Sequence, residues 1–350
     1  MPATRRHLLT APIGLGLPFI RRAAAARRSL TFAAFGRLFQ DMYEPAIVAP
    51  FVAARPDTEV FWYAIPSSMQ ALATLRRQRE RPEIDVVLLD VGTAWAATSE
   101  GLLEPLTAGS LPILADLDPG ALFANIAGPA VFTEPLVMLF DTTKGEPPPF
   151  WKLLWGRLEE REIAVPAPPD PIGIAFAVVA GRLFSGGDVP RMLQGGIAAI
   201  AQLGPRIVTW DPRPDVYHFV AEGNARYGVG WNMMAQIHAD RMAGRLGVAF
   251  PEEGTISRIV TINLVKGARQ PEAARQFIAH ALGPDAQKTM VERMYLGPVN
   301  AKALYLESAL LRTANTPARV ARAMPVDWIM VNGLRDPIVK YWREVVPSTG

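Results

Sequence analysis

The side chains that could perform catalysis in this chain are few. It contains no cysteine, which excludes thiol catalysis, disulfides and cysteine-ligated zinc or iron–sulfur centres. Its four histidines form neither an HExxH motif nor a two-histidine metal spacing. The sequence also lacks a G-x-S-x-G elbow, a Walker loop and a complete G-x-G-x-x-G motif. We therefore expect no catalytic residue, no metal site and no cofactor.

Other polar side chains stand where they could hold a small solute. Arg37 follows the first expected strand, and its guanidinium could bind a carboxylate or phosphate through two hydrogen bonds. Asp90 ends the third expected strand and could accept a hydrogen bond from an amine or hydroxyl, or could cap the next helix. Arg37 could equally be a solvated loop residue. Ser67 and Ser68, at the start of an expected helix, could simply cap that helix. The candidates in this part of the chain are Arg37, Phe39, Ser67, Ser68, Asp90 and Thr93.

These candidates need an α/β arrangement to bring them together. Apolar runs at Ser29–Phe35, Glu59–Ala64 and Ile84–Leu89 predict three strands, with a helix after each of the first two. Ser67 and Gln70 have the spacing of a capping box, which predicts that the second helix begins there. The order predicts a mainly parallel sheet, and ligands bind such sheets at the carboxyl ends of the strands.

The rest of the chain predicts a second α/β unit, which its length of 350 residues allows. Val131–Phe140 is strand-like, and Pro135 within it marks an edge or a crossover. Ile172–Phe184 is expected to form a helix and Ile259–Val265 a strand. Pro271–Leu282 has a proline in its first turn and an apolar face, which predicts another helix.

The first 26 residues are typical of an export signal. A basic start is followed by an apolar segment, shorter than the roughly 20 residues that span a bilayer, and by small residues with an A-x-A pattern. The stretch TRRHLL resembles a twin-arginine signal, and an ordinary secretory signal is the alternative. Four arginines lie in this segment, and subtracting them from the net charge of +3 leaves −1. The remaining chain has no general attraction for nucleic acid.

Several motifs follow one another in an order that is typical of a known family. They are AIVAPF, DVVLLD with GLLEPL, PPFWKLLW, the Glu253-Gly254 corner with KGARQPEAARQFI after it, and GPVN at Gly297–Asn300. Together they resemble the substrate-binding proteins of bacterial ABC importers, in the branch that includes polyamine, iron, thiamine and phosphonate binders.

The resemblance implies a two-lobed periplasmic binding fold of type 2. Each lobe would be a mixed, mostly parallel sheet flanked by helices, and the lobes would close about a hinge on a small solute. We expect lobe 1 to comprise residues 29–133 and 259–309, and lobe 2 residues 134–258 and 310–350. The protein would be a periplasmic monomer that delivers its solute to the membrane permease subunits of the importer and does not alter it.

The resemblance adds four candidates, Trp231, Asn232, Glu253 and Arg258. In the family an aromatic residue near Trp231 often covers the ligand, although a core tryptophan is the alternative. Glu253 could bind a cation or hold the hinge, and Arg258 could enter the cleft or only cross the hinge. Polyamine binders carry a tryptophan and an acid where this chain has Arg258 and Val260. We therefore expect a solute bearing a carboxylate or phosphate, with a polyamine as the alternative.

Two further functions stay open. A periplasmic sensor adaptor that presents its ligand-bound form to a receptor would have the same sequence features. A few enzymes also share the two-lobed fold, so the lack of catalytic motifs does not decide the matter alone.

Overall fold

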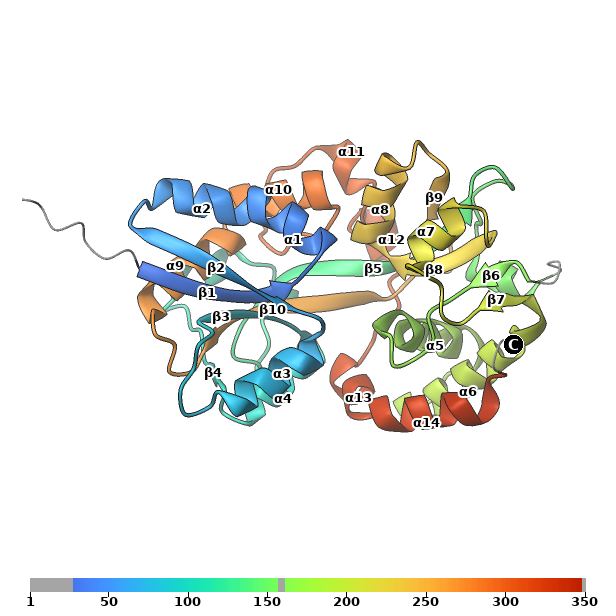
Figure 1. Ribbon diagram of the computed structural model, residues 1–350, viewed down its shortest axis with the longest axis horizontal. Coiled ribbons are helices and arrows are strands. Elements are labelled where there is room, and N and C mark those ends of the chain that lie inside the picture. Colours follow the sequence, from blue (N-terminus) through green and yellow to red (C-terminus); the bar gives the residue numbers. More distant parts are fainter. Residues whose placement is uncertain (1–27, 157–160, 348–350) are drawn as a thin grey trace, which may run out of the picture.

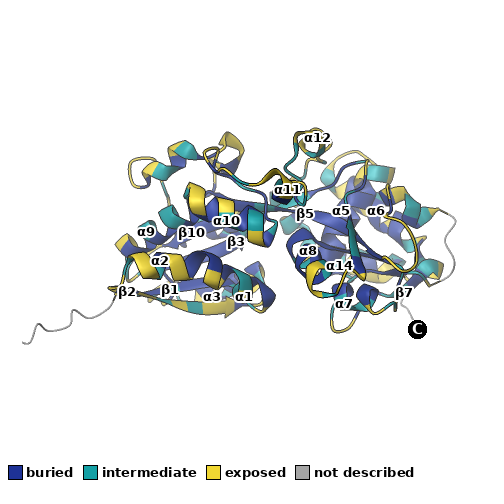
Figure 2. Cartoon of the chain, turned by 90° about the horizontal axis from the view of Figure 1, so that it is seen from above, coloured by how far each residue is buried: buried dark blue, intermediate teal, exposed yellow. Residues whose placement is uncertain are grey.

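The computed structural model describes residues 28–156 and 161–347, so the expected export signal at 1–26 lies outside the described residues. Figure 1 shows two halves side by side, each with strands in the middle and helices outside. Figure 2 shows the same division by burial, with dark blue strands and helices that turn yellow faces outward. Within the described ranges no single helix is long and apolar enough to cross a membrane, and one pair bent by 96° passes that test together.

One mixed sheet runs through both halves. Its main path has the order β2–β1–β3–β10–β5–β8–β6–β7, and β4 and β9 pair at the side with β10 and β5. The strands are β1 (Arg28–Phe35), β2 (Thr58–Ile65), β3 (Val86–Asp90), β4 (Leu103–Glu104), β5 (Ala130–Asp141), β6 (Ile163–Ala164), β7 (Ile207–Thr209), β8 (Tyr227–Trp231), β9 (Leu246–Ala249) and β10 (Ser257–Val265). The pairs of β1 with β2 and β3, and of β6 with β7 and β8, are parallel. All pairs of β5 and β10 are antiparallel.

Strand β5 passes from one half to the other. Its first part pairs with β10, where Glu134 stands opposite Arg258. Its second part pairs with β8 and β9, starting with Leu136 opposite Trp231. Pro135 lies at this change of partner, and a proline has no N–H to continue a ladder. The crossover interpretation of Pro135 is therefore confirmed.

The helices of the first half flank β1, β2 and β3. They are α1 (Leu38–Tyr43), α2 (Ala49–Ala54), α3 (Ser68–Arg77), α4 (Val91–Ser99), α9 (Pro271–Leu282) and α10 (Pro284–Met294). A π-helical segment, Glu44–Val48, joins α1 to α2. It contains Pro45, which cannot donate the usual helical hydrogen bond, and the wider π turn accommodates such a break. The 3-10 turns Pro112–Asp116 and Pro119–Ala121 belong to the loop before β5.

The helices of the second half surround β6, β7, β8 and β9. They are α5 (Pro171–Phe184), α6 (Val189–Ala201), α7 (Val216–Ala221) and α8 (Asn232–Arg241), with 3-10 turns at Trp151–Trp155 and Gly204–Arg206. One buried apolar cluster fills this half, and two others lie in the first half. The expected helices at 172–184 and 271–282 are confirmed as α5 and α9.

The last segment of the chain lies across both halves. It contains α11 (Glu307–Leu310), α12 (Pro317–Val320), α13 (Trp328–Gly333) and α14 (Arg335–Val345). Figure 1 shows α13 at the junction, next to α4 on one side and continuous with α14 on the other. Gly92 of α4 permits this approach, because a β-carbon there would lie 2.6 Å from the carbonyl oxygen of Trp328 and 2.7 Å from the β-carbon of Asn332.

Replacing Gly92 by alanine should push α13 away from α4. We expect a loss of about 1–3 kcal/mol in the free energy of unfolding, as is usual for overpacking at a close contact. Urea unfolding would measure it. Gly333→Ala is the matched control, because no atom lies within 4 Å of a β-carbon at that end of α13. Equal stability of the two variants would contradict this packing of α13.

Candidate functional site

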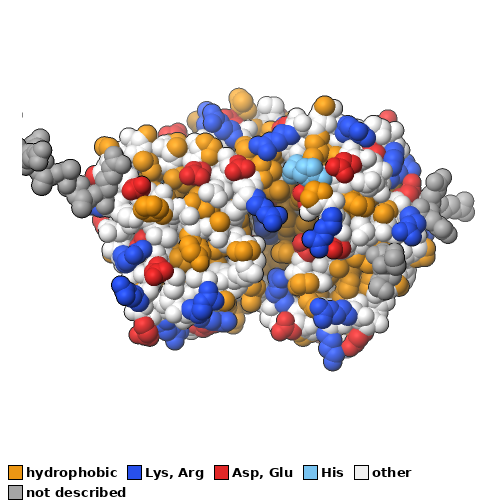
Figure 3. Space-filling view, in the orientation of Figure 1, with side chains coloured by type: hydrophobic (Ala, Val, Ile, Leu, Met, Phe, Trp, Pro, Cys, Tyr) orange, Lys and Arg blue, Asp and Glu red, His pale blue; other side chains and the backbone are white. Residues whose placement is uncertain are grey.

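A cavity of about 250 Å³ lies between the two halves. Figure 3 shows the surface hollowed at this place, with basic side chains at the rim and apolar atoms inside. Strand ends and helix starts of the first half form one wall, and the loop before α5, the end of β8 and helix α13 form the others. At about 30 Å³ per water molecule, the cavity has room for about eight waters, which suits a small solute.

Asp90 is the acid on the wall of the first half. It occupies the N-cap position of α4, but its carboxylate makes no capping hydrogen bond. Instead, the hydroxyl of Ser68 donates to Asp90 Oδ2 at 2.7 Å and accepts from the Asp90 N–H at 2.9 Å. The other oxygen, Oδ1, is buried without a partner among the residues that the structure describes. It is therefore available to a hydrogen-bond donor that is not part of the chain.

Two further polar candidates, Ser67 and Thr93, line the cavity together with Asp90. The predicted cap at the start of α3 is confirmed, because Ser67 Oγ accepts from the N–H of Gln70 at 3.3 Å. Ser67 also lines the cavity, so capping and access to the cavity go together. Thr93 is buried in the first turn of α4, with its hydroxyl 3.9 Å from the sulfur of Met69.

Arg258 of β10 lines the cavity, and its guanidinium forms an ion pair with Glu134 of β5. Its Nε donates to Glu134 Oε2 at 2.8 Å, and Nη2 donates to the same oxygen. Glu134 is completely buried, and its Oε1 accepts from the N–H of Met233 at 2.9 Å. Burial opposes the charge on Arg258, but Glu134 and Asp90 outweigh it and raise the pKa of Arg258 above its usual value.

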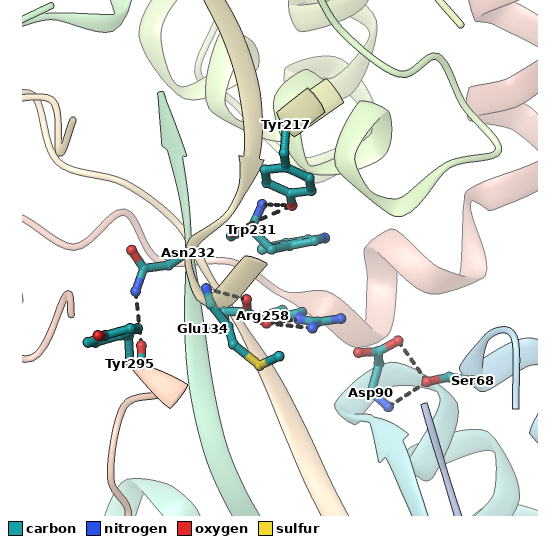
Figure 4. A network of polar contacts seen from close by, with 9 residues as sticks. Ser68, Asp90, Glu134, Tyr217, Trp231, Asn232, Arg258 and Tyr295 are labelled. Atoms are coloured by element: carbon teal, nitrogen blue, oxygen red, sulfur yellow. Dashed lines mark hydrogen bonds and ion pairs between the residues drawn. The ribbon is translucent and has the colours of Figure 1, made fainter. Parts of the chain in front are cut away.

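The ion pair with Glu134 affects how strongly Arg258 can attract an anionic solute. The guanidinium carbon lies 4.9 Å from the ring centre of Trp231 and 5.4 Å from that of Phe35, which holds it between the two halves. Figure 4 shows it pointing from the paired strands towards Asp90. Arg258 thus both crosses the hinge strands and faces the cavity. Its positive charge is already met by Glu134, which weakens the sequence argument that Arg258 makes the solute an anion.

Trp231 covers the cavity from the second half. The hydroxyl of Tyr217 holds its backbone by accepting from the Trp231 N–H at 2.8 Å. Gly230 makes room for that tyrosine, since a β-carbon there would lie 2.5 Å from the Tyr217 ring. Trp231 is only 7% exposed and belongs to the core cluster of this half, yet it also lines the cavity. Trp231 is therefore a core tryptophan that also lines the cavity, and its contact with a solute stays a prediction.

Two candidates of the first half lie outside the cavity lining. Arg37 is exposed, with a φ angle of 58°, and forms no ion pair among the described residues. Phe39 is buried, and its ring stacks on that of Tyr43 with 5.2 Å between the centres. Neither residue lines the cavity, because Arg37 faces solvent and Phe39 completes the core, so their contact with a solute stays an untested prediction.

Two candidates of the second half also lie elsewhere. Asn232 is buried, and its amide donates to the carbonyl oxygens of Tyr295 and Arg312 at 2.9 and 2.8 Å. Glu253 accepts from the N–H groups of Trp151 and Lys152 at 2.9 and 3.2 Å and so caps the turn that they begin. Their polar groups are used by the chain itself, and the structural interpretation of Glu253 holds.

The last segment supplies residues that the sequence did not point to. Trp328, Val331, Asn332 and Arg335 line the cavity, as do Pro169, Pro171 and Ile174 around the start of α5. Arg335 Nη2 donates to the carbonyl oxygen of Pro169 at 2.8 Å, and within the described ranges Arg335 forms no ion pair. No local motif marks this segment, because its position depends on the packing of α13 against α4.

Comparison with known proteins identifies the family. Residues 46–314 match the profile of the family described as bacterial extracellular solute-binding protein. The chain belongs to this family. The gamma-aminobutyric acid-binding protein of Pseudomonas aeruginosa is 26% identical over 350 aligned residues, which cover 93% of this chain and 90% of that protein. The spermidine/putrescine-binding periplasmic protein 1 of Haemophilus influenzae is 22% identical over 229 residues, covering 63% of this chain and 62% of that one.

Solved structures agree with the two-lobed fold. An ABC transporter substrate-binding protein from Bradyrhizobium japonicum superposes with a TM-score of 0.77 at 18% identity, covering 92% of this chain and 100% of that one. The resemblance seen in the sequence is thus confirmed, and this protein is a solute-binding component of an ABC transporter. Members of such a family bind solutes and are not enzymes.

Proposed function

We propose that this solute-binding protein works in the periplasm and captures a short zwitterion, with a cationic amine at one end and a carboxylate at the other. One observation carries the proposal: the cavity presents both an unpartnered carboxylate oxygen, on Asp90, and a guanidinium without an ion pair among the described residues, on Arg335. The first belongs to the first half and the second is hydrogen-bonded to the second half.

The two groups favour different ends of the solute. The Asp90 carboxylate would accept from an ammonium group, and the Arg335 guanidinium would donate to a carboxylate. Nη1 of Arg258, which is not used in the bonds to Glu134, would be a second donor. Between them, Trp231, Trp328 and Ile174 offer apolar surface for a short carbon chain. The relative from Pseudomonas, which binds gamma-aminobutyric acid, supports an ω-amino acid of about this length.

A solute that touches both halves would favour closure of the hinge. Its contacts are complete only when the halves approach, so binding shifts the population towards the closed form. A dissociation constant near 1 μM corresponds to about −8 kcal/mol. Charge-assisted hydrogen bonds of about 1.5–3 kcal/mol each at both ends, together with apolar burial, can supply this after the cost of closure. We propose that the protein acts as a monomer and presents its closed form to the permease.

A thermal-shift screen would test the proposal. The panel would contain ω-amino acids of increasing chain length, α-amino acids, organic acids, sugar phosphates and polyamines. We expect ω-amino acids to raise the melting temperature most, because a ligand present at 100 times its dissociation constant adds about 2.7 kcal/mol of stability. A larger shift with spermidine or putrescine, the alternative that the Haemophilus relative favours, would contradict the proposal.

Replacing Arg335 by glutamine should weaken the solute carboxylate contact alone. We expect affinity for an ω-amino acid to fall about tenfold, which is 1.4 kcal/mol, and affinity for the matching amine to change little. Calorimetry would measure both. Arg37→Gln is the control, since Arg37 is an exposed arginine outside the cavity lining. An equal loss in both variants would point to a general charge effect and would exclude Arg335 from the site.

A further inference from the structure

Two histidines and an aspartate meet on the second half, away from the cavity. Asp215 comes directly before α7, His218 lies in the first turn of α7, and His238 lies in α8. Each offers one ligand atom, and these atoms all lie within 4.8 Å of one another. None of the three lines the cavity between the halves. In Figure 3 histidine surface lies beside acidic side chains over this region.

Asp215 and His218 already form an oriented pair. His218 Nδ1 lies 3.0 and 2.9 Å from the two carboxylate oxygens of Asp215. The same carboxylate accepts from the N–H of His218 at 2.9 Å, which caps α7. The Asp215 carboxylate and the His218 imidazole are therefore already held next to each other, as two ligands of one ion would have to be. The side chains of Asp215 and His218 are 36% and 35% exposed, so an ion could reach them from solvent.

His238 is the most deeply placed member of the cluster. It is 8% exposed, and its ring contributes one of the three ligand atoms. The ring is fixed by stacking on Tyr217 at 5.3 Å and by an edge contact with His218 at 4.7 Å.

We propose that Asp215, His218 and His238 form a binding site for a divalent transition-metal ion such as Zn²⁺. Neutral imidazole suits zinc, copper, nickel and iron, whereas magnesium and calcium prefer sets of oxygen ligands. With metal–nitrogen bonds of about 2.0–2.1 Å, tetrahedral ligand atoms lie about 3.3 Å apart, so small side-chain rotations would close the present spacing. Water would complete the coordination. The ion would join α7 to α8 behind the wall that carries Trp231.

The site is independent of the solute proposal. It shares no residue with the cavity, so solute binding and metal binding can each fail without the other. No sequence motif predicts the cluster, because twenty positions separate the two histidines and only the packing of α7 on α8 brings them together.

Metal titration of the purified, tag-free and chelator-treated protein would test the site. We expect saturable binding of one Zn²⁺ by calorimetry, visible absorption bands when Co²⁺ replaces it, and no comparable response to Mg²⁺. Loss of a group that only orients a ligand typically costs about 10–100-fold in metal affinity, so His238→Gln, which removes a ligand, should cost at least about 100-fold.

Two further variants make the result decisive. Asp215→Asn keeps a helix cap while removing the charge, so it should weaken Zn²⁺ binding in a folded protein. His280→Gln is the control, since His280 is a partly buried histidine outside the cluster that bonds to the carbonyl oxygen of Ile47. It should bind Zn²⁺ as the unchanged protein does. No saturable Zn²⁺ binding, or equal binding by the His238→Gln and unchanged proteins, would overturn the proposal.

Discussion

Replacing Glu134 by glutamine should lower the free energy of unfolding by about 3 kcal/mol, the low end of the range for breaking a buried ion pair. Glu134 is completely buried and accepts two hydrogen bonds from Arg258, whose side chain is only 19% exposed. Without the carboxylate, a guanidinium would remain between two aromatic rings with no opposite charge behind it. Urea unfolding followed by circular dichroism would measure the change.

Two controls separate the buried charge from other effects of the Glu134 substitution. Glu100→Gln removes the partner of Arg76 in an exposed ion pair and should cost about 1 kcal/mol or less. The double variant Glu134→Leu with Arg258→Met should recover much of the lost stability, because well-packed apolar residues often replace a buried pair without cost. A Glu134→Gln protein as stable as Glu100→Gln would show that the pair does not hold the hinge strands together.

Replacing Asp90 by asparagine should abolish most of the affinity for a solute with an amine. A charge-assisted hydrogen bond contributes about 1.5–3 kcal/mol, so the dissociation constant should rise by about 10- to 150-fold. The substitution keeps an oxygen that can accept from Ser68, and the local fold should therefore persist. Calorimetry with the best solute of the screen would measure the loss.

The control for the Asp90 substitution is an aspartate that lies outside the cavity. Asp41 is exposed in α1 and outside the cavity lining, so Asp41→Asn changes the net charge equally without touching the cavity. Its affinity should match that of the unchanged protein. If Asp90→Asn also keeps full affinity while both variants remain folded, the amine end of the solute does not bind at Asp90.

Much of the first half could be predicted because its strands carry a local signal. Short apolar runs bounded by turn residues indicate strands, and the three runs correspond to β1, β2 and β3. Parallel strands end at one edge of the sheet, so residues just after them converge without any long-range information. Ser67, Ser68, Asp90 and Thr93 were found for this reason, and all four line the cavity.

The remaining site could not be predicted, because its residues meet through contacts between distant segments. Arg335 and Trp328 reach the cavity because α13 packs on Gly92, more than 230 positions earlier in the chain. The structural alternative for Glu253 depends on a distant segment too: its carboxylate accepts from two backbone N–H groups, those of Trp151 and Lys152. The charge of a residue in the sequence therefore does not predict whether its polar atoms are available to a solute or are bonded within the chain.

The central claim is that the cavity binds a zwitterion through both of its ends. Calorimetry with 4-aminobutyrate, butylamine and butyrate, three compounds on one carbon chain, tests it most directly. We predict that 4-aminobutyrate binds with a dissociation constant near the micromolar range and that each single-ended compound binds at least about tenfold more weakly, since each lacks one charged contact. If butylamine or butyrate binds as tightly as 4-aminobutyrate, or none of the three binds, the proposed two-ended recognition is wrong.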